Sequence, residues 1–248
     1  MGPIYVLHYK PVANRKASIV KQFALAGIQH CTFVEQYDAE ELTEDIVNSV
    51  FNKDKDVYAQ KVARSMGVFT ENIFYRDKKP WGEGVNYSQD IQWPSPDTIR
   101  YSDLSLIIKH SLAWNDIHNN HEYGIIFEDD IIMLPGFIDE FEAQIANTPS
   151  DWDIIFFGSG CGFRVPERTK GRGVYKMDPP RAKPTDSYVV SKKAAKILSE
   201  NFFPVSQRID WEMQCVCMNL GLSVYWWEPP LTVQGTEIGL YQTTQPQG

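Results

Sequence analysis

The sequence predicts an α/β protein with a mostly parallel central sheet that has helices on both of its faces. Short apolar segments at 4–8, 123–127 and 153–157 alternate along the chain with longer segments whose apolar residues recur at a helical period. Such apolar segments are typical of strands that are covered on both sides. Strand–helix–strand units at this spacing produce parallel sheets, which gives the second part of the prediction.

The first 34 residues contain one complete strand–helix–strand unit. A strand is expected at 4–8 and a second one at 31–34. The helix between them is expected to begin with Asn14 as its N-cap, to run to about Ala26 and to end at Gly27. Its apolar face consists of Ile19, Val20, Phe23 and Ala24.

Residues 51–100 interrupt this order. The segment contains three prolines, scattered aromatic and charged residues, and no clear period. A loop of this length is usually functional, so we expect an insertion that lies over a cleft rather than a separate domain. The prediction is one domain at 1–241 with an insertion at about 51–100, followed by a flexible tail at 242–248.

Regular elements resume at Asp103. Residues 158–177 are rich in glycine and are expected to form a loop or hairpin. Gly221 is expected to end the last helix. Helices are predicted at about 103–117, 135–145, 192–200 and 209–220, and strands at 123–127, 153–157, 187–190 and 224–227.

Composition excludes several classes of protein. The net charge of −8 and the absence of a dense basic run argue against a nucleic-acid partner. No apolar run is long enough to span a membrane, and the first residues do not resemble a signal peptide, so a cytoplasmic location is expected. The four cysteines match no zinc spacing and are expected to be reduced thiols.

The strongest local signal is the acidic run Glu128, Asp129 and Asp130, which follows the apolar segment 124–127. Ligands of open α/β sheets bind at the carboxyl ends of strands. Three adjacent carboxylates repel one another, and hard divalent cations prefer oxygen ligands of this kind. The run therefore predicts a cation site, and a solvated acidic turn is the alternative.

Four further residues have both a functional and a structural interpretation. Asp210 and Glu212 lie in the first turn of a helix, where acids stabilise the helix dipole or can act as a general base. His110 lies on an apolar helical face and is either a core residue or a ligand. Arg15 lies near a helix N-terminus and makes either an exposed salt bridge or a contact with a phosphate or a base.

These residues belong to a wider resemblance to glycosyltransferase family 25, which includes bacterial lipooligosaccharide and collagen galactosyltransferases. The most specific piece is 125–130, which looks like the family's strand ending in Glu-Asp-Asp. Lys109 departs from the family, which has a serine before the histidine. The other similar pieces are 4–7 with Arg15, 104–105 with His110 and Trp114, 185–191 with 194–195, 209–212, and 229–235.

The resemblance implies a GT-A-type, Rossmann-like fold and an inverting transfer of a sugar from a nucleotide-sugar donor, such as a UDP-hexose, to a hydroxyl of a glycan acceptor. It implies a divalent metal, Mn²⁺ or alternatively Mg²⁺, held by Glu128 and Asp130. Asp210 would be the catalytic base, with Glu212 as the second choice. The implied donor-binding residues are Arg15, Lys109, His110, Glu128, Asp129, Thr185 and Asp186.

The resemblance also leaves a ligand position open. Family members often add a C-terminal histidine to the metal shell, but no histidine follows His121 here. Gln234 is the candidate replacement. Trp81 and Trp93 of the insertion are expected to cover part of the acceptor.

Two other functions compete with sugar transfer. A metal-dependent phosphohydrolase also uses carboxylates at strand ends, although it would need more acids and histidines to converge. A non-catalytic carbohydrate-binding protein would explain the high aromatic content of 13% but not the acidic run.

Overall fold

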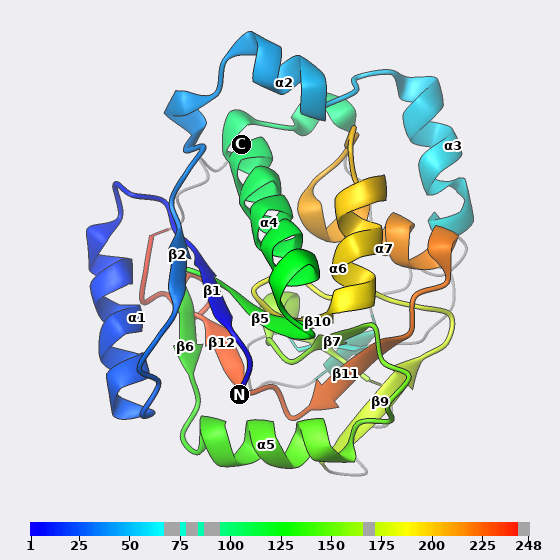
Figure 1. The fold of residues 1–248 in the computed structure, drawn as a ribbon. Coiled ribbons are helices and arrows are strands. Elements are labelled where there is room, and N and C mark those ends of the chain that lie inside the picture. Colours follow the sequence, from blue (N-terminus) through cyan, green and yellow to red (C-terminus); the bar gives the residue numbers. More distant parts are fainter. Residues whose placement is uncertain (67–74, 78–83, 87–94, 166–171, 243–248) are drawn as a thin grey trace.

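The computed structural model describes residues 1–66, 75–77, 84–86, 95–165 and 172–242. These form an α/β fold around a seven-stranded sheet in the order β2-β1-β5-β10-β7-β11-β9 (Figure 1). Each strand predicted from the sequence is present, with ends that differ by a residue or so. The strands are β1 (Ile4–Leu7), β2 (Thr32–Val34), β5 (Tyr123–Glu128), β7 (Ile154–Phe156), β9 (Gly173–Met177), β10 (Ser187–Ser191) and β11 (Val224–Glu228).

Most strands of the sheet run in one direction. β1 pairs in parallel with both β2 and β5, and β7 pairs in parallel with β11. β10 lies antiparallel between β5 and β7, and β9 is antiparallel to β11 at the edge. β2, β1, β5, β7 and β11 therefore share a direction, and the sheet is mixed because β10 and β9 oppose it.

Helices cover both faces of the sheet, as predicted (Figure 1). One face packs against α4 (Tyr101–Asn120), α6 (Lys192–Asn201) and α7 (Ile209–Leu220), and the other against α1 (Ala13–Leu25) and α5 (Phe137–Asn147). Successive side chains of a strand point to opposite faces. Tyr5 and Leu7 accordingly belong to the first core cluster, and Ile4 and Val6 to the second. Both faces need apolar residues, which explains the continuously apolar strands.

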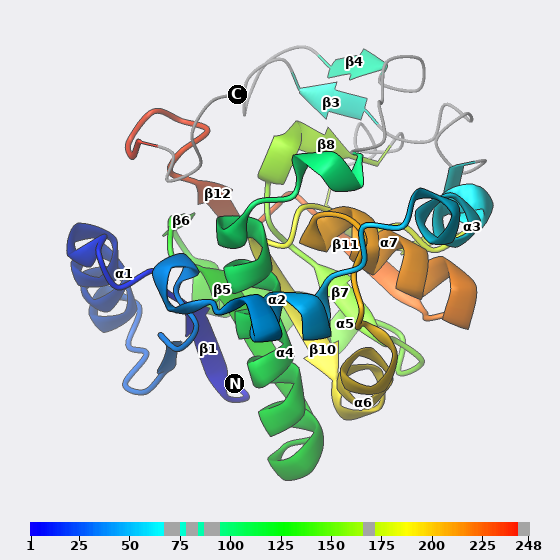
Figure 2. The same cartoon turned by 90° about the horizontal axis from the view of Figure 1, so that it is seen from above.

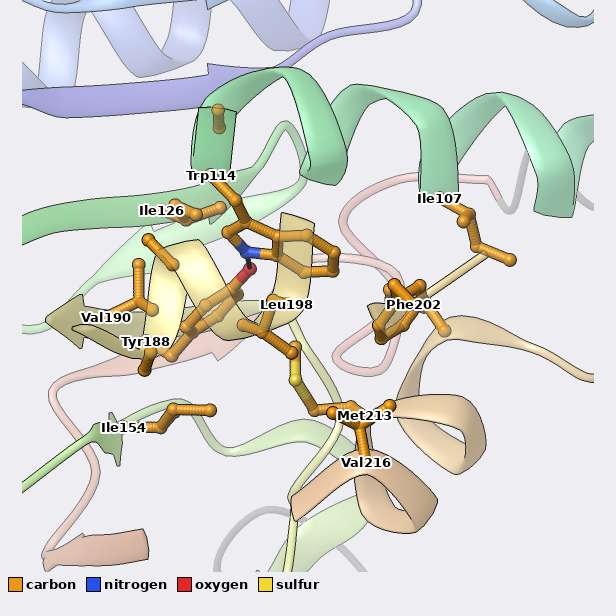
Figure 3. Close-up of a cluster of buried hydrophobic side chains, with 14 of the residues drawn as sticks. Ile107, Trp114, Ile126, Ile154, Tyr188, Val190, Leu198, Phe202, Met213 and Val216 are labelled. Atoms are coloured by element: carbon orange, nitrogen blue, oxygen red, sulfur yellow. Dashed lines mark hydrogen bonds between the residues drawn. The ribbon is translucent and has the colours of Figure 1, made fainter. Parts of the chain in front are cut away.

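The core beneath α4 joins three helices to the sheet (Figure 3). Trp114 of α4 packs edge to face on Phe202, with ring centroids 4.7 Å apart, and its indole nitrogen donates a hydrogen bond to the Tyr188 hydroxyl of β10 at 2.8 Å. Leu198 of α6 and Met213 of α7 complete this layer. Truncating one such buried aromatic to alanine typically costs about 3–5 kcal/mol.

Two smaller sheets lie outside the central one. β6 (Ile131–Met133) pairs antiparallel with β12 (Thr232–Gln234) and extends directly from the acidic run. β3 (Tyr75–Asp77) pairs with β4 (Gly84–Asn86) and with β8 (Phe163–Arg164). Figure 2 shows β12 and the loop after it beyond the carboxyl ends of β1 and β5.

The structure corrects two sequence predictions. The predicted insertion is not without regular structure, because α2 (Glu44–Val50) is followed by the helix α3 (Lys55–Met66), which packs on α7. Asn14 is not the N-cap of α1. The helix begins at Ala13, one residue earlier, after Val12, whose side chain makes no capping hydrogen bond. Gly27 and Gly221 follow their helices with positive φ, as predicted.

Among the described residues, no helix is both long enough and apolar enough to cross a membrane.

Candidate functional site

A cleft of about 530 Å³ opens at the carboxyl ends of β1 and β5. The two strands are adjacent, with Leu7 paired to Glu128, so the residues that follow them lie side by side. This volume falls within the range of small-molecule sites. Residues from β1, β5, α4 and the C-terminal segment line the cleft, among them His8, Tyr9, Arg15, Ser105, Lys109, Glu128, Asp129, Asp130, Gln234 and Thr236.

Asp129 is neutralised by groups from the β1 side. It accepts a hydrogen bond from Arg15 at 2.8 Å and from the Tyr9 backbone N–H at 3.0 Å, and it lies 2.9 Å from His8 Nδ1. Burial opposes the ionisation of Asp129, but these hydrogen bonds outweigh it and lower its pKa. Both oxygens of Asp129 are therefore engaged within the protein, and its place is to fix the loop after β1.

Arg15 lies beneath the cleft and is buried, so the exposed salt bridge considered from the sequence does not occur. Besides Asp129, it donates a hydrogen bond to the Gln242 carbonyl at 2.7 Å and stacks near the Tyr241 ring at 5.4 Å. Lys109 is also buried, where it donates to the His8 carbonyl at 2.6 Å and pairs with Asp38. Both cations line the cleft, as their predicted donor-binding role requires.

Glu128 lies at the end of β5 with 19% of its side chain exposed. The Thr185 hydroxyl donates to its Oε1 at 2.9 Å. Burial, with a smaller contribution from the charge of Asp129, raises the pKa of Glu128 to about 7 despite this hydrogen bond. Thr185 therefore contacts the predicted metal ligand and does not itself line the cleft.

Asp130 is the third carboxylate of the run. Its Oδ2 accepts a hydrogen bond from the Thr236 hydroxyl at 2.6 Å, while its Oδ1 is buried and has no hydrogen-bond partner among the described residues. Burial, followed by repulsion from Glu128, raises the pKa of Asp130 to about 6. Glu128 and Asp130 are therefore two closely placed acids whose charge the surrounding protein does not balance.

Asp186 adds a third acid behind these two. It is fully buried, and neither of its oxygens has a hydrogen-bond partner in the described part of the chain. A Cβ on Gly158 or Gly160 would lie within 2.6 Å of this carboxyl group, so glycine is required at both positions. Burial and then repulsion from Glu128 raise the pKa of Asp186. It is not among the residues that line the cleft.

His110 is fully buried and does not line the cleft either. Its Nδ1 lies 2.8 Å from the Tyr188 hydroxyl, and its Nε2 lies 3.9 Å from Glu128 Oε1. Burial lowers the pKa of His110 to about 3, so the imidazole is neutral at physiological pH. The predicted role of His110 at the donor would therefore act through Glu128, which its Nε2 faces.

The two candidate bases at the start of α7 have different surroundings. Asp210 is partly buried, and burial, with a smaller contribution from Glu128, raises its pKa to about 6. Glu212 is fully buried, where it pairs with Lys61 of α3 at 2.5 Å and accepts a hydrogen bond from the Ser206 backbone N–H at 3.2 Å. Neither residue is among those that line the cleft, and of the two, Asp210 is the more exposed.

A divalent ion would fit between Glu128 and Asp130. The buried oxygen of Asp130 that has no hydrogen-bond partner among the described residues is an available ligand, and burial raises the pKa of both acids. In the described part of the chain, no three His, Cys, Asp or Glu side chains are arranged to hold a metal. Water and substrate phosphate would have to complete the shell, as is common for Mg²⁺. Gln234 lines the cleft, and Trp81 and Trp93 lie outside the described residues.

Sequence reasoning missed three residues of the site. His8 directly follows β1, so its position at the strand end was a usable signal. Asp38 and Thr236 come from loops, and neither has a sequence motif that connects it to Lys109 or Asp130.

Comparison with models of known protein families finds no match for this chain, and comparison with curated proteins finds none either.

Proposed function

We propose that this chain is a glycosyltransferase of the GT-A type, similar to family 25, that moves a sugar from a nucleotide-sugar donor to a hydroxyl of a glycan acceptor. The observation that carries the proposal is the division of charge in the cleft. Glu128 and Asp130 keep raised pKa values although Arg15 acts to lower them, and Arg15 and Lys109 line the same cleft. A diphosphate with a bound metal ion carries positive and negative charge. The two acids would contact the metal ion, and the two cations would contact the phosphates.

Glu128 and Asp130 would hold the divalent ion, which when bound stabilises negative charge on the diphosphate leaving group. Arg15 and Lys109 would orient the phosphates, since both are fixed by Asp129, Asp38 and backbone carbonyls and need little reorganisation. In this arrangement, preorganised positive charge would face the phosphates on which negative charge develops.

Asp210 would accept the proton of the acceptor hydroxyl as that oxygen attacks the sugar. Its pKa of about 6 leaves it ionised at neutral pH and more basic than an ordinary aspartate. A base is most effective when its pKa is near the working pH, which fits this value. Glu212, paired with Lys61, would instead fix the start of α7.

The test is incubation of the protein with a panel of sugar nucleotides and Mn²⁺, with and without glycan acceptors. We expect one nucleotide to be released in step with sugar transferred, and slow release of free sugar when no acceptor is present. Rapid release of phosphate from the donor would instead indicate a phosphohydrolase. Binding of glycans that needs neither nucleotide nor metal, with no turnover, would indicate a carbohydrate-binding protein.

A further inference from the structure

A chain of buried polar groups runs from α4 through β10 toward Glu128. The Trp114 indole nitrogen and His110 Nδ1 each lie 2.8 Å from the Tyr188 hydroxyl (the Trp114–Tyr188 bond is drawn in Figure 3). All three side chains are fully buried. Bulk water does not reach them, so their hydrogen-bonding roles are set by the groups that surround them.

The hydrogen-bond donors and acceptors around His110 determine which of its ring nitrogens carries the proton. The indole N–H of Trp114 is a donor only, so the oxygen of Tyr188 accepts from it. Among the described residues, the partner within reach of the single Tyr188 hydroxyl proton is His110 Nδ1, which must accept it. In a neutral imidazole the other nitrogen carries the proton, so His110 is the Nε2–H tautomer.

That Nε2–H has no hydrogen-bond partner among the described residues. It faces Glu128 Oε1 at 3.9 Å, slightly too far for a hydrogen bond. The Glu128 side chain is partly exposed, unlike those of Trp114, Tyr188 and His110. Its Oε1 already accepts a hydrogen bond from Thr185 at 2.9 Å. A small rotation of the Glu128 side chain would close the gap, and such bonds often tighten when a ligand binds.

We propose that His110 is a positioning residue that donates its Nε2–H to Glu128, and that Tyr188 and Trp114 set the tautomer that makes this possible. Thr185 and His110 would then hold the carboxylate from two sides and direct its remaining lone pairs into the cleft. The use of Glu128 to bind a cation rests on the proposed function, whereas the tautomer does not.

A purely structural histidine would differ in one testable respect. The core role needs only the contact between Nδ1 and Tyr188, whereas the proposed role also needs a donor at the position of Nε2. Asparagine can approximate the first nitrogen of the ring and glutamine the second. His110→Asn and His110→Gln therefore separate the two roles at a single position.

The first measurement is the ¹⁵N NMR spectrum of histidine-labelled protein without metal. We expect Nε2–H in the wild type, and loss of the single tautomer in Tyr188→Phe, which removes the donor to Nδ1. Observation of Nδ1–H in the wild type would overturn the proposal, and this readout is independent of any transferase activity.

The second measurement is Mn²⁺ affinity by electron paramagnetic resonance. Removing a hydrogen-bonding partner of a metal ligand typically weakens metal affinity by about 10–100-fold. We expect a loss of this size in His110→Asn and Tyr188→Phe, and substantial recovery in His110→Gln. Affinity equal to the wild type in folded His110→Asn, or no Mn²⁺ binding by the wild type, would overturn the role. If His110→Asn fails to fold, Tyr188→Phe decides the question. Mn²⁺ binding that follows this pattern without sugar transfer would refute the proposed function alone.

Discussion

Replacing Asp130 with asparagine is expected to stabilise the ligand-free protein while it abolishes sugar transfer. The asparagine side chain would retain an acceptor for the Thr236 hydroxyl, which now donates to Asp130 at 2.6 Å. The change would remove a buried charge that faces a second acid, Glu128, and that no described group neutralises. Loss of a charge-stabilising group typically lowers turnover by about 10²–10³-fold.

The magnitude follows from the pKa of Asp130, which rises from 3.8 to about 6. Between these values the native state binds more protons than the unfolded state, so stability falls as pH rises through this window. A pKa difference of about 2 between the two states corresponds to about 3 kcal/mol at most. Because Glu128 also relaxes when its neighbour loses charge, we expect a gain of about 1–3 kcal/mol at about pH 8, and no gain below pH 3.8.

Thermal melting in the presence of a chelator tests this expectation at about pH 3 and about pH 8, which lie on either side of the window. For a chain of this size, 1 kcal/mol corresponds to a shift in Tm of about 2–4 °C. Asp151→Asn is the control, because a hydrogen bond from Lys176 lowers the pKa of Asp151 and its removal gives no stabilisation. Mn²⁺ should raise the Tm of the wild type but not of Asp130→Asn. A folded Asp130→Asn that melts below the wild type at the higher pH would refute the reasoning.

Three further substitutions test the other assignments. Asp210→Asn should lower transfer by about 10²–10⁴-fold without lowering Tm at about pH 8, because burial raises the pKa of Asp210 and its charge therefore opposes folding. Wild-type turnover should rise with pH through about 6 as the base ionises, and a flat pH profile would argue against a base here. Glu212→Gln should lower Tm through loss of the ion pair with Lys61 but keep turnover within tenfold, and a stable but inactive variant would return Glu212 to the catalytic residues. Arg15→Met should cost about 3–5 kcal/mol in denaturant unfolding because it removes the guanidinium that pairs with the buried Asp129, and adding Asp129→Asn should restore stability but not donor affinity. Recovery of donor affinity in that double variant would exclude Arg15 from the donor site.

Elements with strong local signals could be predicted from the sequence. The helix at 209–220 has a regular apolar stripe and ends at Gly221, whose φ of 63° is easy only for glycine. The helix α3 could not be found in this way. Within its described side chains, Val62 is the buried apolar residue, and the helix is held to α7 partly by Lys61. Tertiary contacts decided its structure, and these are not encoded in a local period.

The candidate site likewise has one part that could be predicted from the sequence and one part that could not. That Arg15 would lie near the acidic run followed from topology, because β1 and β5 had to end at the same edge of the sheet. Which acid would pair with Arg15 did not follow, since this depends on the direction of each side chain after the strand ends. The contacts of Asp38 with Lys109 and of Thr236 with Asp130 join loops far apart in the sequence, and loop geometry carries no periodic signal.

The structure also shows why the three adjacent acids do not have equivalent roles. Asp129 is paired within the protein and has a lowered pKa, so folding alone accounts for it. Glu128 and Asp130 have raised pKa values, so their ionised forms oppose folding. The same burial that makes these charges unfavourable in the free protein strengthens their attraction for a cation, because electrostatic interactions are larger where water is excluded. With a divalent ion bound, the two ionised acids would therefore stabilise the folded protein instead of destabilising it. Burial therefore explains both why the two acids destabilise the free protein and why they would bind a cation in the cleft.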